Sequence, residues 1–321
     1  MSARLRALAR QTQEIVDRGG YRAPGGHEVP LAAAIEAARA GTRMYGPEPV
    51  RLEEADEVDG PARRAGGHAP APVAVEVTGE SSLEAARRLV PAADDEVAVL
   101  NFASARNPGG GFLDGAQAQE EALCRSSALY ACLRGVRPFY DHHREHRDPL
   151  YTHRVIHSPG VPVFREDDGF REDDGFRGDD GFRGDDGFRG DDGFRGDDGF
   201  RGDDGRLLDA PYRVAFLTAA APNAGVLRSR APERAAEVPR ALVARAERVL
   251  EVAALHGHRR LVLGAWGCGV FRNDPAEVAA AFRGHLTGGG RFTYRFERVV
   301  FAVLDRTPGA GVRGAFARAF A

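Results

Sequence analysis

The sequence predicts a layered α/β domain with a mostly parallel or mixed sheet. Apolar strand-like segments alternate with segments of helical spacing from about residue 71 onward, the pattern of strand–helix–strand units. Two glycine-rich loops, at residues 109–111 and 264–273, each follow an apolar strand and precede a helix. With 321 residues, 43% of them apolar, the chain is long enough to bury a sizeable core.

The elements of the first half begin with a helix over the first 19 residues, which ends at a Gly-Gly pair. Residues 20–70 are rich in glycine and proline and mixed in pattern. The next three segments carry clearer signals: a strand at 71–77, a helix with a serine start at 81–90, and a buried strand at 96–104. The first glycine loop follows this strand directly.

The second half continues the alternation. The pattern predicts a helix at 118–133, followed by strands at 152–164 and 212–222. A long helix is predicted at 232–258, broken or begun afresh near Pro239. It is followed by a strand at 259–275 that leads into the second glycine loop, a helix at 275–286 and a final strand at 296–305.

A low-complexity tract interrupts this pattern at residues 164–205. It consists of seven hexapeptides of the form F-R-(E/G)-D-D-G. One apolar residue in six cannot build a core, so the tract is expected to be a disordered loop inserted between two strands. A calcium-binding array is the alternative, but the known calcium-binding repeat is nine residues long and each copy here carries a neutralising arginine.

The composition limits where the protein works. The formal net charge is −3, and the basic residues are all arginine, which we attribute to coding bias rather than to a nucleic-acid surface. The tract carries −9 of this charge and leaves +6 on the remainder, which suits an anionic ligand.

Three cysteines without metal-ligand spacing favour a reducing compartment. With no apolar secretory segment or membrane span, a cytoplasmic protein is expected.

The glycine loops point to a ligand. Glycine tolerates positive φ and lets a ligand approach the main chain, and a loop between a strand and a helix directs N–H groups at an anion. A tight turn is the alternative for Gly109, Gly110 and Gly111 alone. The second loop strengthens the case, because ligands of open α/β sheets bind at the carboxyl ends of strands. Neither G-x-G-x-x-G spacing nor a P-loop lysine is present, so a different phosphate-bearing ligand is expected.

Gln119, Glu120 and Glu121 follow the first loop at a helix start. Adjacent helical residues point about 100° apart, so the two carboxylates cannot both flank one bond as a glycosidase pair does. One should reach the reacting centre and the other should bind or orient. The alternative is that they only complement the helix dipole.

Two rival sites are less well supported. His142, Glu145 and His146 fit the H-x-x-E-H pattern of a zinc peptidase, but apolar residues are absent from 141–149 and prolines flank the segment, so a solvated polar loop is expected. Cys268 lacks a recognisable neighbouring base and is interpreted as a small residue in a tight loop.

These motifs together resemble a known family. GGG, seven residues and QEE, with "AWGCGVFRNDP" after a long helix, closely resemble the bacterial-type poly(ADP-ribose) glycohydrolases over roughly residues 20–305. The resemblance implies a macrodomain-like three-layer α/β/α fold with a mixed central sheet. We expect an N-terminal helical extension at 1–70 packed on a catalytic domain at 71–321, with the disordered insertion at 164–205.

The resemblance also implies an activity: hydrolysis of the ribose–ribose O-glycosidic bond of poly(ADP-ribose), mainly from chain ends, releasing ADP-ribose. Glu121 matches the catalytic glutamate that protonates the departing oxygen and deprotonates water, and Glu120 matches a ribose-binding neighbour. The expected substrate contacts lie on the two loops: Asn107, Gly109, Gly110, Gly111 and Gln119 on the first, and Gly267, Cys268, Gly269, Val270 and Phe271 on the second. In the second loop, Phe271 would pack on the terminal ribose and fix Glu121.

Two other functions share this ligand: a macrodomain that binds ADP-ribose without cleaving it, and a hydrolase of another ADP-ribosyl linkage on a protein, a nucleic acid or an acetyl ester. The Glu120–Glu121 pair argues against a pure binder. No cofactor, no metal and no sequence-specific nucleic-acid binding are expected, and the partners are poly(ADP-ribose) or ADP-ribosylated macromolecules. Glu80 and Asn223 are candidates for contacts to adenine.

Overall fold

The computed structural model describes residues 2–50, 52, 71–90, 96–167 and 205–321. A seven-stranded sheet runs through its centre in the order β3-β6-β7-β5-β8-β9-β4. The strands of the sheet are β3 (Arg43–Tyr45), β4 (Ala74–Thr78), β5 (Ala98–Phe102), β6 (Val155–Arg165), β7 (Leu207–Ala219), β8 (Arg260–Gly264) and β9 (Arg298–Ala302). β6 is antiparallel to both β3 and β7, and the other neighbours pair in parallel. The predicted mixed sheet is therefore confirmed.

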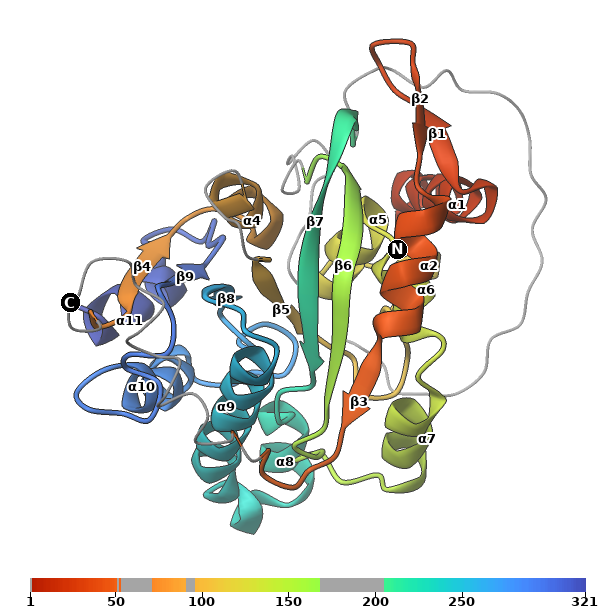
Figure 1. Ribbon diagram of the computed structural model, residues 1–321. Helices are drawn as coiled ribbons and strands as arrows, with labels where there is room; N and C mark the ends of the chain where they lie inside the picture. The colour runs from red at the N-terminus through yellow and green to blue at the C-terminus, as the bar shows by residue number, and fades with distance from the viewer. Residues whose placement is uncertain (1, 51, 53–70, 91–95, 168–204) are drawn as a thin grey trace.

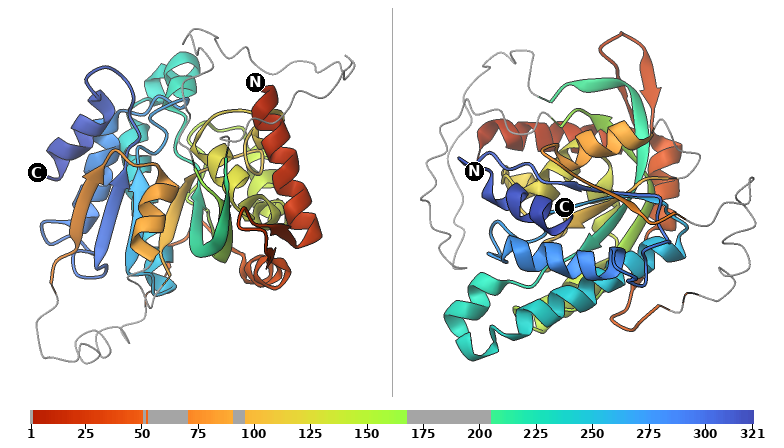
Figure 2. Two further views of the ribbon diagram at one scale, coloured as in Figure 1. Left: turned by 90° about the horizontal axis from the view of Figure 1, so that it is seen from above. Right: turned by 90° about the vertical axis from the view of Figure 1, so that its left-hand side faces the viewer.

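Helices cover both faces of this sheet (Figures 1 and 2). One face packs against α1 (Ala3–Arg18), α2 (Ala32–Gly41), α4 (Ser82–Leu89), α5 (Gln119–Ser126), α6 (Leu129–Leu133) and α7 (Arg137–Glu145). The other packs against α8 (Ala224–Arg230), α9 (Glu237–Leu255), α10 (Pro275–Leu286) and α11 (Gly311–Ala319). Alternate strand residues serve opposite layers: Val99 of β5 belongs to the first core cluster, and its neighbours Ala98 and Leu100 to the second. The fold is the predicted three-layer α/β/α arrangement.

The N-terminal segment contributes to both the core and the sheet. The side chain of Ser2 accepts a hydrogen bond from the N–H of Leu5 and begins α1, and Gly19 ends it at φ 74°. A small hairpin of β1 (Gly20–Arg22) and β2 (Glu28–Pro30) connects α1 to α2. β3 then pairs with β6 at the edge of the central sheet. This segment therefore supplies one of the seven strands as well as helices.

Two helical segments differ from the sequence prediction. The segment 118–133 forms two short helices, because Ser127 is extended and bridges to Val163. The prediction of a polar loop around His142 was wrong, because this residue lies on the helix α7. Pro138 sits in the first turn of this helix, where a missing N–H costs nothing. Phe139 of the same helix is buried in the first core cluster. Elsewhere the break near Pro239 is confirmed: the 3-10 turn η3 (Pro232–Arg234) precedes α9.

The hexapeptide tract leaves from the end of the β6–β7 hairpin, as predicted. Arg165 pairs with Leu207, and the N–H of Glu166 donates to the carbonyl of Arg206 at 2.9 Å. Residues 168–204 lie outside the described part of the chain, and with them most of the predicted disordered insertion.

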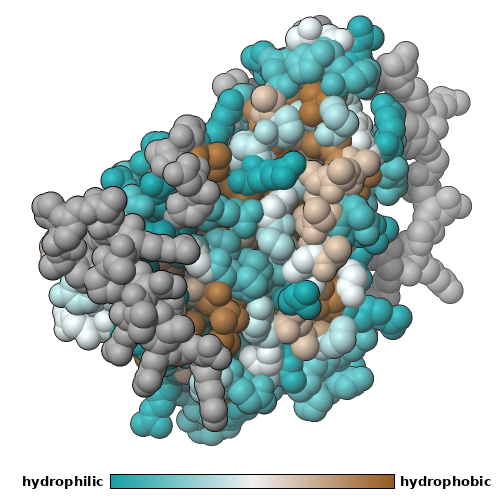
Figure 3. All heavy atoms as spheres, in the orientation of Figure 1, coloured by the Kyte–Doolittle hydropathy of each residue, from teal (hydrophilic) through white to brown (hydrophobic). Residues whose placement is uncertain are grey.

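The surface seen in Figure 3 is largely hydrophilic, with hydrophobic residues in several separate groups. Within the described ranges, no helix combines the length and apolar character needed to cross a membrane.

Candidate active site

The two glycine loops leave the same edge of the sheet. β5 and β8 are neighbouring parallel strands, paired at Ala98 and Leu261, so their carboxyl ends lie side by side. The first loop runs from β5 through the 3-10 turn η2 (Phe112–Asp114) into α5, and the second runs from β8 into α10. This is the edge at which open α/β sheets bind ligands.

Glycine is required in the first loop for two reasons. Gly109 and Gly110 have φ values of 69° and 59°, in the left-handed region that other residues rarely adopt. A Cβ on Gly110 would also collide with the Glu121 carboxylate, and one on Gly109 would lie 2.9 Å from the ring of Tyr130. The glycines therefore bring the backbone against the glutamates.

The two glutamates are buried but bonded differently. Glu121 is 7% exposed; its Oε1 accepts a hydrogen bond from the N–H of Gly111 at 2.9 Å, and its Oε2 has no donor among the described residues. Glu120 is 2% exposed, and both of its oxygens are bonded: the N–H of Ser104 donates at 2.6 Å and the Asn101 amide at 3.2 Å. One carboxylate oxygen of the pair is thus left for another molecule, and it belongs to Glu121.

Burial raises the pKa of Glu120 to about 8, and the neighbouring Glu121 carboxylate also raises it, while the hydrogen bonds from Ser104 and Asn101 oppose this. Glu120 therefore keeps its proton near neutral pH, which avoids two adjacent buried negative charges.

The first loop directs its amides inward. The sequence predicts that its N–H groups face an anionic ligand. In the structure the N–H of Gly111 meets the Glu121 carboxylate, and the N–H of Gly110 donates to the carbonyl of Asn107 at 3.0 Å. The N–H of Gly111 therefore binds the protein's own Glu121 carboxylate rather than a ligand anion.

The polar residues beside the loop differ in their availability. Gln119 donates to the hydroxyl of Ser82 at 3.0 Å and to the carbonyl of Leu100 at 2.7 Å, and accepts from the N–H of Phe102. Its amide donors are both engaged, so this side chain ties α5 to β5. Asn107 is exposed, and its side chain has no hydrogen-bond partner in the described ranges, so it can meet a ligand.

The second loop has N–H groups to offer. Gly267 has φ 71° and packs where an added Cβ would lie 2.6 Å from Cβ of Ala221. Asn273 fixes the loop by donating its N–H to the carbonyl of Gly267 and its side-chain amide to that of Pro222. Within the described ranges, the backbone N–H groups without an acceptor include those of Gly269, Val270 and Phe271. Successive unbonded N–H groups of this kind bind anions.

Side chains of the second loop range from exposed to partly buried. Val270 is 71% exposed. The ring of Phe271 lies 5.9 Å from that of Tyr151. Burial raises the pKa of the Cys268 thiol to about 12, and Asp274 adds to the effect. The thiol is therefore protonated at neutral pH and is unsuited to nucleophilic attack.

The adenine candidates are committed to other partners. Glu80 pairs with Arg88 at 2.7 Å, and the side chain of Asn223 accepts from the N–H of Val226 at the start of α8. Neither side chain projects freely toward a ligand.

Sequence reasoning missed Asn101, Ser104 and Tyr151. Asn101 was detectable as a polar residue inside an apolar strand, and its side chain is fully buried between Glu120 and Thr218. Tyr151, with φ 57°, carries no local sequence signal.

Of the histidines of the zinc-like pattern, His142 lies on α7 and His146 directly follows it, and their rings stack at 4.0 Å between centroids. Among the described residues, no group of three or more His, Cys, Asp or Glu side chains could hold a metal ion.

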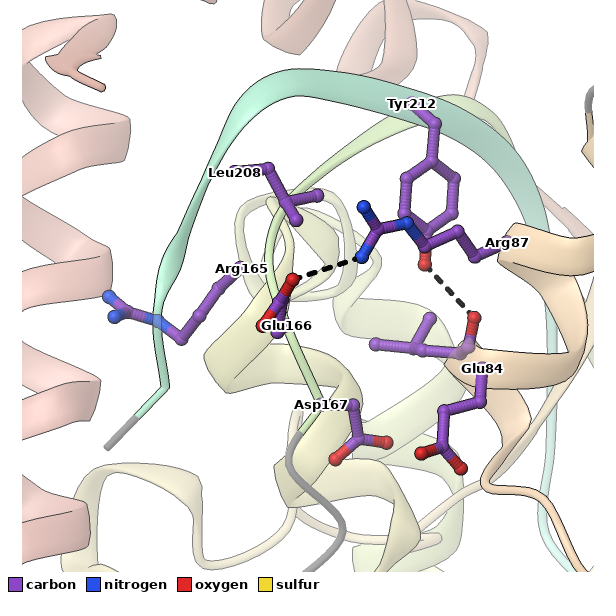
Figure 4. A pocket seen from close by; sticks show the side chains of 8 residues that line it. Glu84, Arg87, Arg165, Glu166, Asp167, Leu208 and Tyr212 are labelled. Atoms are coloured by element: carbon purple, nitrogen blue, oxygen red, sulfur yellow. Dashed lines mark hydrogen bonds and ion pairs between the residues drawn. The ribbon is translucent and has the colours of Figure 1, made fainter. Parts of the chain in front are cut away.

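A separate cavity of 230 Å³ lies between α4 and the end of the β6–β7 hairpin (Figure 4). Within it, Arg87 pairs with Glu166 at 3.2 Å, and the hydroxyl of Tyr212 donates to the carbonyl of Leu83. None of its lining residues belongs to either glycine loop, so this cavity is not the site of the glutamates.

Comparisons with known proteins place the chain in a family. Residues 9–166 match the model of the catalytic domain of microbial-type poly(ADP-ribose) glycohydrolase (PARG). No curated protein matches the chain.

Solved structures match nearly the whole chain. A crystal structure of poly(ADP-ribose) glycohydrolase from Thermomonospora curvata is 50% identical, with a TM-score of 0.78 over 98% of this chain and 99% of that one. The same enzyme bound to the inhibitor ADP-HPD is 48% identical, with a TM-score of 0.76 over 98% of both chains. The poly(ADP-ribose) glycohydrolase of Deinococcus radiodurans in complex with ADP-ribose is 41% identical, with a TM-score of 0.69 over 91% of this chain and 98% of that one. The chain described here therefore belongs to the microbial-type poly(ADP-ribose) glycohydrolases.

Proposed function

We propose that the chain is an enzyme that hydrolyses the ribose–ribose O-glycosidic bond of poly(ADP-ribose) and releases ADP-ribose, mainly from chain ends. Family membership supports the reaction, and related structures are described as bound to ADP-ribose and to the inhibitor ADP-HPD. The observation that carries the assignment of Glu121 is its buried Oε2, which has no donor among the described residues while Oε1 is fixed by Gly111.

Glu121 is the general acid and base of this proposal. It gives a proton to the departing ribose oxygen as the glycosidic bond breaks, and then takes a proton from the water that attacks the oxocarbenium-like carbon. The fixed Oε1 orients the carboxylate and leaves Oε2 for both transfers. The proton returns to Glu121 at the end of the cycle, so the reaction consumes only water.

Glu120 has a supporting role as the contact to the ribose beyond the bond. Each carboxylate oxygen accepts up to two hydrogen bonds, so Glu120 retains capacity for a ribose hydroxyl while Ser104 and Asn101 hold it. The protonated form of Glu120 avoids placing a second negative charge beside Glu121.

The rest of the ligand lies along the second loop. The free N–H groups of Gly269, Val270 and Phe271 suit a diphosphate, with Gly267 and Cys268 lining the same loop. The ring of Phe271 packs on the terminal ribose, and Asn107 supplies a polar contact from the first loop. Held phosphates position the reacting bond beside Glu121.

The direct test is incubation of the wild type and Glu121→Gln with purified poly(ADP-ribose), with Glu277→Gln as a control because Glu277 is an exposed glutamate on α10. Loss of the general acid should reduce ADP-ribose release by roughly 100- to 10,000-fold, whereas the control should match the wild type. Equal product from the wild type and Glu121→Gln would refute the assignment of Glu121.

Preference among ADP-ribosyl linkages is measured in the same assay. A substrate carrying a single ADP-ribose on a protein contains no ribose–ribose bond, so we expect it to persist while the polymer shortens.

We place the enzyme in the cytoplasm, since Cys124, Cys132 and Cys268 are free thiols, the usual state in a reducing compartment.

A further inference from the structure

Arg245 is an arginine in the interior of α9 that is 1% exposed. Its guanidinium donates to the carbonyl of Ala220 at 2.6 Å and to the carbonyl of Leu150 at 2.7 Å. Within the described ranges, neither bond nor ion pair links it to a carboxylate. Burial lowers the pKa of Arg245 to about 9, which still leaves the side chain charged at neutral pH.

A second arginine on the same helix shows the usual solution to burial. Arg248 is 4% exposed and forms an ion pair with Glu251, which is 2% exposed. A buried charge without an opposite charge is costly. Among the described residues, Arg245 has no such paired carboxylate: Asp148, which pairs with Arg234, offsets part of its burial cost from a distance. The rest of its charge is available to a nearby anion.

The carbonyl groups that Arg245 holds lie next to the second glycine loop. Ala220 lies between Ala219, whose carbonyl accepts from the indole of Trp266, and Pro222, whose carbonyl accepts from Asn273. Its neighbour Ala221 packs directly on Gly267. The backbone beneath the loop is thus held from three sides.

The second carbonyl belongs to a segment that meets the same loop. Leu150 precedes Tyr151, whose ring lies beside that of Phe271. The neighbouring carbonyl of Pro149 accepts from the N–H of Asn223. Arg245 therefore joins the two backbone segments that flank the loop with free N–H groups.

The charge of Arg245 is felt across this region. Burial lowers the pKa of His153 to about 4, and Arg245 lowers it as well. Burial likewise lowers the pKa of His143 to about 4, with Arg245 among the smaller causes. A positive field thus extends from α9 into the segment that faces Phe271.

We propose that Arg245 is a positioning residue for the diphosphate: it holds the backbone of Leu150 and Ala220 against the second glycine loop and supplies buried positive charge that balances the phosphates. The inference rests on the proposed function, in which this loop binds the diphosphate of ADP-ribose. Charge opposite to the ligand and held in a low-dielectric interior acts more strongly than the same charge in water.

The test compares Arg245→Met, Arg245→Lys and the control Arg240→Met, because Arg240 is an exposed arginine on the same helix. Affinities for ADP-ribose and for adenosine, which lacks phosphates, are measured on each full-length variant. Arg245→Met should bind ADP-ribose about tenfold more weakly, the effect of one charge at an intermediate dielectric, and adenosine as the wild type does. Arg245→Lys should keep most of the ADP-ribose affinity, and Arg240→Met all of it.

A spectroscopic readout separates charge from packing. The pKa of His153, followed by NMR, should rise in Arg245→Met and stay low in Arg245→Lys, because only the first variant removes the charge of Arg245, while burial and Arg248 lower this pKa in both. Wild-type ADP-ribose affinity in a folded Arg245→Met overturns the proposal. If Arg245→Met does not fold, Arg245→Lys is measured instead, and an equal loss of ADP-ribose and adenosine binding in that variant overturns the proposal. Polymer hydrolysis by the wild type tests the proposed function separately, because neither the ligand affinities nor the pKa of His153 depends on turnover.

Discussion

The backbone N–H of Gly111 donates a hydrogen bond to Oε1 of Glu121 at 2.9 Å. The glycine loop therefore fixes one oxygen of the carboxylate and leaves the other, buried and without a protein donor among the described residues, for chemistry. This division of a single carboxylate between anchoring and reaction explains why a loop of three glycines stands so close to a pair of glutamates.

Gly110→Ala should greatly reduce activity. The new Cβ would be forced against the Glu121 carboxylate, at a backbone φ of 59° that alanine tolerates poorly. Moving the acid by about 1 Å costs on the order of 100-fold in rate. Steady-state hydrolysis of the polymer measures the loss. Gly284→Ala is the matched control, because an added Cβ there meets no atom within 4 Å, and equal activity of the two variants would contradict the prediction.

The rate of ADP-ribose release should fall as the pH rises through about 8. Below this value Glu120 is protonated and neutral, because burial raises its pKa to about 8; above it the ionised Glu120 disfavours the second buried carboxylate that forms when Glu121 gives up its proton. A pH–rate profile from pH 5 to 10 measures the midpoint. The profile of Glu120→Gln should lack this alkaline limb, and an unchanged limb in that variant would show that another group causes it.

Glu120→Gln should also change the pH dependence of stability. The folded-state pKa of Glu120 lies above its ordinary value of 4.5, so its contribution is fully present below pH 4.5 and is lost as the pH rises through about 8. The glutamine has no charge to bury, and rotation of the Asn101 amide offers it an acceptor, because Oδ1 of Asn101 lacks a partner.

The variant should therefore exceed the wild type in unfolding free energy at pH 9 by on the order of 5 kcal/mol, at about 1.4 kcal/mol per pKa unit over the shift from 4.5 to about 8, and by much less at pH 4.5. Denaturant unfolding at both pH values measures this. Glu277→Gln, at an exposed site, should show no such difference, and the same gain for Glu120→Gln at both pH values would contradict the argument.

Deleting residues 168–204 should leave activity and the unfolding midpoint close to those of the wild type. Glu166 is already hydrogen-bonded to Arg206 across the hairpin, so the deletion leaves Asp167 and Gly205 as a two-residue connection. Asp-Gly is a favoured two-residue hairpin turn, and Gly205 has a positive φ of 72°.

Thermal unfolding and polymer hydrolysis of the deletion variant test this directly. Adding Arg165→Ala should lower the midpoint, because Arg165 donates to Gln11 at 2.8 Å and to the carbonyl of Gly205. A deletion variant that fails to fold or to turn over substrate would show that the tract is needed.

The sequence by itself determined the order of the main strands and helices, the mixed α/β class and the position of both glycine loops. These are local signals: apolar periodicity, capping serines and glycines, and proline in a first turn. The pattern also predicted that the two loops follow strands, and parallel pairing of β5 with β8 then puts them at one edge.

Only the tertiary structure decided how the side chains are used. Gln119 serves β5 rather than an open ligand site, Asn101 reaches Glu120 from a strand, and Arg245 reaches Ala220 and Leu150 from α9. Such contacts join residues far apart in the chain, and local periodicity carries no record of them. Helix α7 was missed for the same reason, because burial of Phe139 against distant residues outweighs the polar character of the segment that follows.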